Sequence, residues 1–241
     1  MIKKNLFLVT LCLSFLWSSA LLHGEITHQR KFTVAISLGE VCQPAGNLHA
    51  NQMRYQSFPL DWLITPFEGL FQFIANEGKD FAKKENLLFN ITAFGIPNGV
   101  LDTRYGIYFY HDFEFSSKIC DNNIKKFQEV EVKKYDEDKT KLERRIKRFF
   151  DILHSDKKVL LVRLGITRRE ALRLDGLLHT QYPHLDYVIV AVDDREEAKY
   201  DWGLQRVKNF YMERKTMWDS RLEDWKAILA QFPFEHIPAS S

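Results

Sequence analysis

The sequence predicts an α/β fold, a single layered domain with a mostly parallel central sheet and flanking helices. Two segments are typical of strands that are covered on both faces of a sheet: Val159–Arg163, an apolar run that ends in a charge, and the continuous apolar run Tyr187–Val192. A helical pattern lies between them, so that strand, helix and strand follow one another within about 35 residues, as in a βαβ unit. The chain has 241 residues, 45% of them hydrophobic, and can therefore bury a sizeable core.

The first part of the domain predicts a strand followed by two helices. Phe32–Ile36 is rich in β-branched and apolar residues and indicates a buried strand, which Gly39 interrupts. Pro44 suits the first turn of a helix, which we expect to extend toward Tyr55. Thr65–Glu68 has the spacing of a capping box and predicts a second helix, whose apolar stripe is formed by Phe67, Leu70, Phe71 and Ile74.

The middle of the chain predicts two strands and a turn. Leu87–Phe89 is a short apolar run, and the Ile96–Gly99 segment, with its Pro-Asn-Gly sequence, indicates a turn. Tyr105–Phe113 is rich in strand-forming residues. If this strand is regular, His111 continues its apolar face and Asp112 points to the opposite side.

The remainder of the chain returns to helices and strands. Residues 124–153 combine a highly charged composition with an apolar residue every three or four positions, which predicts a long amphipathic helix. Thr167–Glu170 predicts a second capping box at the start of the crossover helix, which Tyr182-Pro183 ends. A strand over Val207–Met212 and a helix containing Trp218 to Leu229 complete the domain.

The first 24 residues have the organisation of a secretory signal peptide. Lys3 and Lys4 precede an apolar run over residues 6–17, and small residues follow it, so we expect cleavage after Ala20 or Gly24. The run is shorter than the roughly 20 residues that span a membrane, so we predict a secreted or periplasmic protein without a stable membrane span. The α/β domain then occupies residues 30–232, and residues 233–241 form a loose tail.

Composition argues against several classes of function. The formal net charge of +2 arises from nearly balanced acids and bases, so nucleic acid is not an expected partner. No two cysteines or histidines stand at a spacing that suits metal ligands, and no glycine-rich phosphate loop follows a strand. We therefore predict no metal and no cofactor.

Cys42 is the candidate nucleophile. It lies where the strand that ends near Ser37 turns into the next helix, and the free amides and dipole of a helix start favour a thiolate, the reactive form of cysteine. The alternative is a structural cysteine. After removal of the signal peptide, Cys42 and Cys120 remain in an oxidising compartment, and a bond between them would stabilise the domain by about 4 kcal/mol.

A cysteine nucleophile requires an imidazole base within hydrogen-bond reach. His49 lies two turns along the same helix as Cys42 and is too far along the helix axis. His154, His179 and His184 fall at helix ends or turns, where a solvated histidine is the usual outcome. His111 ends an apolar strand, where a buried polar group requires a reason, and is therefore the best candidate base.

Four sequence motifs, which follow one another along the chain, support a family resemblance. The chain resembles the DUF1796 family of papain-like cysteine peptidases through Ser37-Leu38-Gly39-x-x-Cys42, Ser57–Trp62, Tyr105–Phe113, and Lys134-Tyr135 with Arg144–Phe149. The resemblance covers roughly residues 32–192. It implies that Cys42 is the nucleophile, that His111 is the base, and that Asp112 or another acid orients the imidazole.

On this basis we expect an exported thiol hydrolase, either a peptidase or an amide or acyl transferase, that acts on a peptide or another amide-containing substrate through a Cys42 thioester. We predict that the substrate is bound by Ser37, Gly39, Gln43, Asp61, Trp62 and Arg163. Two alternatives remain open: a non-enzymatic exported module in which Cys42 is structural, and a glycan-modifying transferase. The transferase would use the carboxyl ends of the parallel strands near Arg163 and Asp193.

Overall fold

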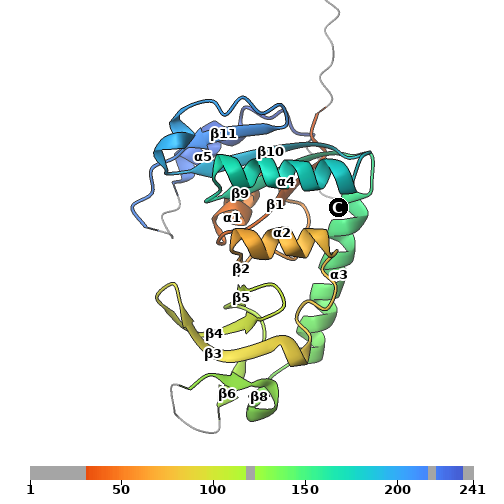
Figure 1. Cartoon of the computed structure of the whole chain (residues 1–241), viewed down its shortest axis with the longest axis vertical. Helices are drawn as coiled ribbons and strands as arrows, with labels where there is room; N and C mark the ends of the chain where they lie inside the picture. Colours follow the sequence, from red (N-terminus) through yellow and green to blue (C-terminus); the bar gives the residue numbers. More distant parts are fainter. Residues whose placement is uncertain (1–30, 118–122, 217–220, 236–241) are drawn as a thin grey trace, which may run out of the picture.

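The computed structural model describes residues 31–117, 123–216 and 221–235, and it confirms an α/β fold with a parallel sheet. The expected signal peptide and Cys120 lie outside these residues. The parallel sheet has the strand order β1-β9-β10-β11 (Figure 1). Its strands are β1 (Val34–Ser37), β9 (Lys158–Leu164), β10 (Asp186–Asp193) and β11 (Val207–Tyr211).

Helices cover both faces of this sheet, as the continuous apolar strands predict. Alternate residues of β9 face opposite layers: Leu160 packs with α1 (Gln43–Ala50) and α5 (Leu222–Leu229), whereas Leu161 packs on the other side. That other side holds α2 (Phe67–Ala75) and α4 (Arg168–Gln181), which contact one another. The β1 strand pairs with β9 in parallel, which places the carboxyl end of β1 at the same edge as the ends of β9 and β10.

A second, antiparallel sheet occupies the other half of the molecule and was not expected from the sequence. Its strand order is β2-β5-β4-β3-β7. The strands are β2 (Leu63–Ile64), β5 (Ile107–Phe109), β4 (Ile96–Asp102), β3 (Leu87–Ala93) and β7 (Lys125–Lys126), and a separate pair is formed by β6 (Phe115–Ser117) and β8 (Val130–Val132). One hydrophobic core joins the two sheets, because it contains buried residues of both, such as Leu161 and Phe109.

The turn of the β3–β4 hairpin differs from the sequence-based expectation. Ile96–Gly99, predicted as a turn, begins strand β4. The chain reverses instead at Phe94 and Gly95, which both have left-handed backbones with φ of 53° and 74°. Two consecutive left-handed residues suit the twist of a two-residue hairpin. The proline and glycine of the segment therefore lie in the strand beside the turn.

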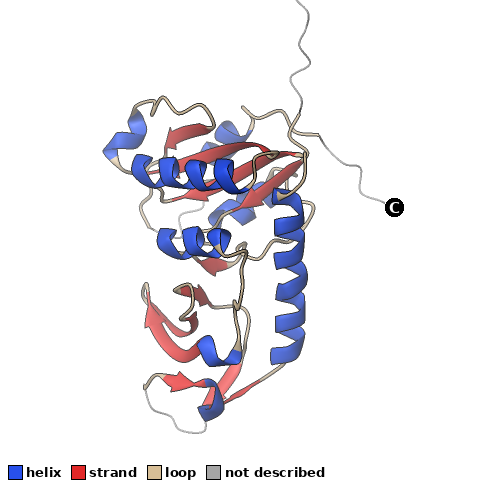
Figure 2. Ribbon diagram, turned by 45° about the vertical axis from the view of Figure 1, so that its right-hand side comes forward, coloured by secondary structure: helices blue, strands red, loops and turns tan. Residues whose placement is uncertain are grey.

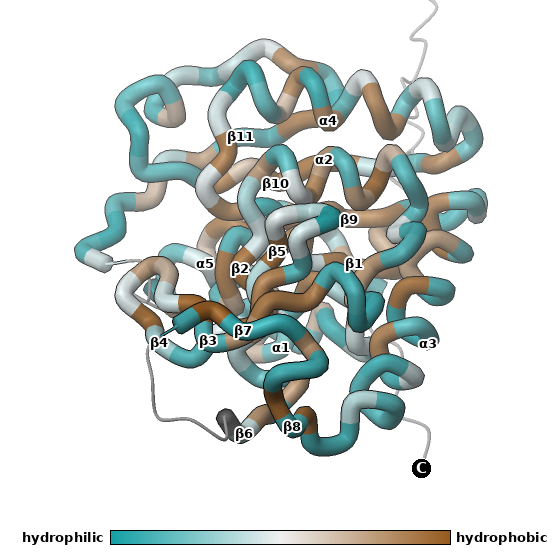
Figure 3. Tube along the Cα trace, turned by 60° about the horizontal axis from the view of Figure 1, so that its bottom comes forward, coloured by the Kyte–Doolittle hydropathy of each residue, from teal (hydrophilic) through white to brown (hydrophobic). Residues whose placement is uncertain are grey.

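Helix α3 (Tyr135–Leu153) runs beside both sheets (Figures 1 and 2). The predicted helix from residue 124 begins later, because residues 125–132 form β7, the 3₁₀ turn η2 (Phe127–Glu129) and β8. Hydrophobic and hydrophilic positions alternate along α3 (Figure 3), and its buried positions include Leu142, Phe149 and Leu153. Further 3₁₀ turns are η1 (Lys84–Asn86) and η3 (Glu196–Lys199).

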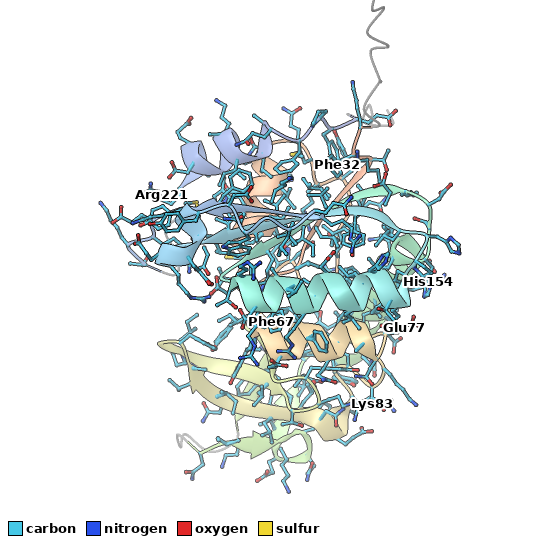
Figure 4. The ribbon with its side chains drawn as sticks, turned by 45° about the horizontal axis from the view of Figure 1, so that its top comes forward. Phe32, Phe67, Glu77, Lys83, His154 and Arg221 are labelled. Carbon is cyan, nitrogen blue, oxygen red and sulfur yellow. The ribbon has the colours of Figure 1, made fainter. Side chains whose placement is uncertain are left out.

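The two predicted capping boxes have different outcomes. Thr167 caps α4, because its hydroxyl accepts the Glu170 backbone N–H and the Glu170 carboxylate accepts the Thr167 N–H, as predicted. The box at Thr65 does not form, since α2 starts after Pro66 and the Thr65 hydroxyl lies against Gly39. The end of α3 is tied to the segment after α2 by His154, whose Nε2 lies 2.9 Å from Glu77 Oε1 (Figure 4).

The start of the expected loose tail is ordered against the first strand. The backbone N–H of Phe32 donates to the Pro233 carbonyl at 2.9 Å, and the N–H of Glu235 donates to the Phe32 carbonyl at 2.9 Å. The side chains of Phe32 and Phe234 are buried in one hydrophobic cluster. Residues 236–241 lie outside the described part of the chain.

A buried carboxyl in β4 makes stability depend on pH. Asp102 is fully buried and accepts the N–H groups of Ala82 and Tyr105, yet burial raises its pKa to about 6. Because this pKa lies above that of an unfolded aspartate, the protonated form stabilises the fold. That contribution is complete below about pH 4 and is lost as the pH rises through about 6, at a cost of about 3 kcal/mol.

We expect the Asp102→Asn variant to remove this pH dependence. The difference in unfolding free energy between the wild-type protein and the variant is measured by urea denaturation between pH 4 and pH 7. The contributions of other titrating groups are the same in both proteins and cancel in this difference. The wild-type protein should lose stability relative to the variant as the pH rises. Asp80→Asn is the control, since the pKa of Asp80 is lowered by Lys83 and Asp80 titrates below this range. A constant difference for Asp102→Asn would contradict the expectation.

Candidate functional site

A cavity of about 540 Å³ lies between the start of α1 and the antiparallel sheet. One wall is formed by the start of α1 and by strand β2 with the residue before it, and the other by strand β4 of the β3–β4 hairpin and the bend after β5. The residues that line it are Cys42, Trp62, Leu63, Ile64, Ile96, Pro97, Asn98, Tyr110 and His111. The cavity thus brings together Cys42, Trp62 and His111, three of the residues predicted from the sequence.

Cys42 lies at the strand-to-helix corner, as predicted. It is the N-cap of α1, has a free thiol and is half-buried. Burial raises the pKa of the Cys42 thiol, and the backbone N–H of Cys42 itself opposes this effect. Desolvation by burial thus opposes the thiolate that the start of a helix favours.

The loop before Cys42 is held by Arg163. This side chain is fully buried, and its guanidinium donates from Nη1 to the Leu38 carbonyl at 2.8 Å and from Nη2 to the Thr65 carbonyl at 2.7 Å. Burial lowers the pKa of Arg163 to about 10. Arg163 therefore lies behind the Cys42 loop and joins it to the segment after β2, rather than lining the cavity.

Two consecutive left-handed residues, Gly39 and Glu40, turn the chain from β1 into the loop, with φ of 77° and 74°. A Cβ at Gly39 would lie 2.8 Å from the Thr65 hydroxyl, so glycine permits the close approach of these segments. Glu40 Oε2 accepts from Arg214 Nη1 at 3.0 Å, and Arg214 also lies 3.3 Å from Asp194. These contacts fix the backbone that presents Cys42.

His111 lies in a bend after β5 and is exposed, so the expectation of a buried histidine that continues the apolar face is wrong. Strand β5 ends at Phe109, because the chain turns there toward α3. The Phe113 N–H donates to Asp138 Oδ2 at 2.9 Å, and Asp112 Oδ1 lies 2.8 Å from Lys141 Nζ. Asp112 therefore anchors the bend that carries His111 to α3 through an ion pair.

Trp62 borders the cavity at the end of a braced loop. The neighbouring Asp61 is buried, accepts the Phe58 N–H at 2.8 Å and pairs with Arg54 at 2.6 Å. The Arg54 guanidinium also lies 5.6 Å from the centre of the Trp62 ring. From α3, Arg148 Nη1 donates to the Ser57 carbonyl at 2.7 Å. The Ser57–Trp62 motif and the arginine-rich motif of α3 thus meet here, and together they fix the position of Trp62.

The other predicted substrate-binding residues lie behind the cavity wall. Ser37 is buried, and its Oγ accepts the Gly39 N–H at 3.2 Å. Gln43 is buried with its Oε1 at 3.4 Å from the Trp225 indole nitrogen. The structure therefore does not bring Ser37, Gly39, Gln43, Asp61 or Arg163 to the cavity lining. They support the loops that form it.

Six lining residues were not predicted as site residues from the sequence: Ile96, Pro97, Asn98, Tyr110, Leu63 and Ile64. The first three were expected in a turn, and Tyr110 in a strand. The Tyr110 hydroxyl donates to the Ala93 carbonyl at 3.0 Å, which ties the ring to the hairpin. No local pattern marks these four residues, because the sheet pairing of β4 and β5 brings them to Cys42.

Charged groups at the carboxyl ends of the parallel strands pair with one another. Asp193 is buried, its Oδ1 accepts the Asp194 N–H at 2.8 Å, and its Oδ2 lies 2.9 Å from Arg195. Burial raises the pKa of Asp193 to about 6. Among the described residues, no three His, Cys, Asp or Glu side chains gather in a way that could hold a metal ion. None of the helices in those ranges has the length and apolarity needed to span a membrane.

Comparison with known proteins identifies a family. A family model described as "Putative papain-like cysteine peptidase (DUF1796)" matches residues 33–197. The matched range contains every residue that lines the cavity. No curated protein and no solved structure gave a significant match to the chain.

Proposed function

Because the chain belongs to the DUF1796 family, described as "Putative papain-like cysteine peptidase", we propose that it is a thiol hydrolase in which Cys42 is the nucleophile and His111 the general base. The observation that carries the proposal is that Cys42 and His111, 69 positions apart in the sequence, line the same cavity. The substrate is a peptide or another amide whose carbonyl enters this cavity next to the thiol.

The raised pKa of Cys42 favours a neutral thiol in the resting site. As the Cys42 sulfur attacks the substrate carbonyl carbon, the thiol proton passes to the His111 ring, and a tetrahedral oxyanion forms. The C–N bond then breaks, His111 returns the proton to the leaving amine, and a thioester remains. Water attacks the thioester, His111 accepts its proton and gives it back to the departing sulfur, which releases the carboxylic acid and restores the thiol.

The developing oxyanion requires hydrogen-bond donors. We assign this role to the backbone N–H of Cys42 and to the side-chain amide of Asn98, which lines the cavity from β4. Preorganised donors of this kind stabilise the transition state more than the ground state. Asp112 acts as a positioning residue, because its ion pair with Lys141 holds the bend that presents His111.

We also propose that the mature protein acts outside the cytoplasm. The support for this is the sequence of residues 1–24, with two lysines, an apolar run and small residues in the order of a signal peptide. In such a compartment Cys120 competes as a disulfide partner for Cys42. The hydrolase therefore requires Cys42 to remain reduced or to be reduced before it acts.

The test is the reactivity of Cys42. Purified protein is treated with iodoacetamide at several pH values and analysed by intact and peptide mass spectrometry. Since burial raises the thiol pKa, the rate of Cys42 alkylation should rise about tenfold for each pH unit between pH 7 and pH 9. The same samples, incubated with a casein peptide mixture, should generate new peptide termini.

The Cys42→Ala variant should lose both the alkylation and the new termini, whereas the Cys120→Ala variant should keep both. Unchanged cleavage by Cys42→Ala would disprove the assignment. Mass spectrometry of the non-reduced protein adds a second criterion. If Cys42 is bonded to Cys120 in all molecules of an active preparation, Cys42 is not the nucleophile.

A further inference from the structure

The lining of the Cys42 cavity defines the chemical class of group that it can hold. Of the described residues that line it, none is an aspartate, glutamate, lysine or arginine. Beyond Cys42 and His111, the side-chain polar groups in the lining are those of Asn98, Trp62 and Tyr110. The rest of the wall is aliphatic surface from Leu63, Ile64, Ile96 and Pro97.

The Tyr110 hydroxyl and the charge next to Trp62 are both engaged within the protein. The Tyr110 hydroxyl donates to the Ala93 carbonyl, so the ring turns its apolar surface to the cavity. The positive charge behind Trp62 belongs to Arg54, and Asp61 neutralises it through an ion pair of 2.6 Å. A charged substrate group in this cavity would therefore lose water without gaining a counter-ion.

The apolar surface continues past the cavity along the hairpin. Phe94 has an exposed ring, 46% accessible, and stacks edge-on against Tyr108. Its backbone is left-handed, which is unusual for an aromatic residue, and it holds the ring at the hairpin tip next to Ile96. The hairpin tip is seen at the left of the lower half of Figure 1.

From this geometry we propose that the cavity selects an uncharged, apolar acyl group, and that Ile96 is a specificity-determining residue. The proposal rests on the proposed function, since it assigns the acyl side of the scissile bond to this cavity. Two sources supply such a group: a peptide with an apolar side chain next to the cleaved bond, and a fatty acyl amide. Ile96 lies at the hairpin edge of the wall and is partly exposed, so a substitution there changes the chemistry of the cavity with little effect on the core.

Covalent labelling of Cys42 tests the selectivity. Matched peptidyl chloromethyl ketones that end in Leu, Glu or Lys, and a decanoyl chloromethyl ketone, are compared by the rate of mass gain at Cys42. We expect the leucyl or decanoyl reagent to label Cys42 about 10- to 100-fold faster than either charged reagent, as is typical for an apolar pocket. The faster of these two identifies the source. Equal rates for the apolar and charged reagents would overturn the proposal.

The Ile96→Lys variant adds a cation to the wall and should reverse the preference, so that the glutamyl reagent becomes faster than the leucyl reagent. Ile124→Lys is the matched control, because Ile124 is 61% exposed and lies outside the cavity, and this variant should keep the wild-type order. An unchanged order in Ile96→Lys would contradict the assignment of Ile96.

A separate measurement distinguishes failure of this inference from failure of the proposed function. The Cys42→Ala variant cannot react, so its binding of fluorescein-labelled leucyl and glutamyl peptides is measured by anisotropy. If no reagent labels Cys42 but the leucyl peptide binds at least tenfold more tightly, the hydrolase is disproved and the apolar site is retained. If the two peptides bind equally, the inference fails whatever the reactivity of Cys42.

Discussion

We expect the free energy of unfolding of the Arg163→Met variant to be about 3 kcal/mol lower than that of the wild-type protein, because two buried carbonyl oxygens lose their hydrogen-bond donors. These are the carbonyls of Leu38 and Thr65. Each unsatisfied buried group costs about 1–3 kcal/mol. Part of this cost is offset because the variant no longer has to desolvate a buried guanidinium. Within the described part of the chain the guanidinium Nε has no hydrogen-bond partner, which is consistent with that offset.

Urea denaturation measures this effect, and alkylation of Cys42 measures its consequence at the site. The loop of Leu38–Cys42 should move when its anchor is lost, so the pH dependence of Cys42 alkylation should approach that of an exposed thiol. Arg163→Lys should recover part of the stability, since an ammonium retains the charge but not the planar fork that reaches both carbonyls.

Arg173→Ala is the control for loss of an arginine. Arg173 pairs with Glu68 at the surface, where ion pairs contribute little, so this variant should lose much less stability than Arg163→Met. If Arg163→Met were within about 0.5 kcal/mol of the wild-type protein, a value typical of surface substitutions, Arg163 would have no role in holding the loop.

The parallel half of the fold could be predicted from the sequence because its determinants are local. Val159–Val162 and Tyr187–Val192 are apolar without interruption, and the capping box at Thr167 marks the start of the helix between them. Each observed strand is one residue longer at both ends than the predicted strand. In this region pattern, hydrogen bonds and packing all favour one structure.

The antiparallel half depends on pairing between segments far apart in sequence, which no local pattern records. Strand β2 has two residues, and β3 pairs with β7, so single apolar runs did not reveal a sheet. Residues 125–132 have a helical composition, yet they add strands to the β-sheets. Tertiary pairing therefore overrides local propensity there.

The candidate site shows the same division. Cys42 could be predicted because a strand, a glycine and a helix-compatible proline follow one another along the chain. Asn98 and Tyr110 could not, because β4 and β5 bring them to the cavity through sheet register. Arg163 was expected to bind substrate because it ends an apolar strand, but the carbonyls of the Cys42 loop take both ends of its guanidinium. A charged side chain in a buried strand requires hydrogen-bond partners, and backbone carbonyls of the protein can supply them instead of a substrate.

The His111→Ala variant is expected to lower kcat/KM by a factor of about 10²–10⁴ at neutral pH, the usual contribution of a general base. The pKa of the Cys42 thiol is raised by burial, so little thiolate is present without a group to take the proton. Stability should change little, because His111 is exposed and lies in a bend whose anchors are on α3. The measurement is the initial rate of amide hydrolysis with an apolar fluorogenic substrate, together with a urea denaturation curve.

The pH profile separates loss of a base from a general disturbance of the site. In His111→Ala the thiolate must form by ionisation of Cys42 alone, so kcat/KM should rise about tenfold per pH unit up to the raised pKa of the thiol. In the wild-type protein His111 takes the thiol proton during the attack, so kcat/KM should depend less steeply on pH than in the variant. His49→Ala is the matched control, because His49 is also exposed and lies on α1, the helix that Cys42 caps.

Asp112→Asn tests the bend itself. Loss of the ion pair with Lys141 loosens the backbone that presents His111 but leaves the base in place, so kcat/KM should fall less than in His111→Ala while the wild-type pH profile persists. A steep profile in Asp112→Asn would mean that the carboxylate acts directly on the imidazole. If His111→Ala retained activity within about twofold of wild type, far below the contribution of a general base, the proton acceptor for Cys42 would have to come from another element of the cavity wall.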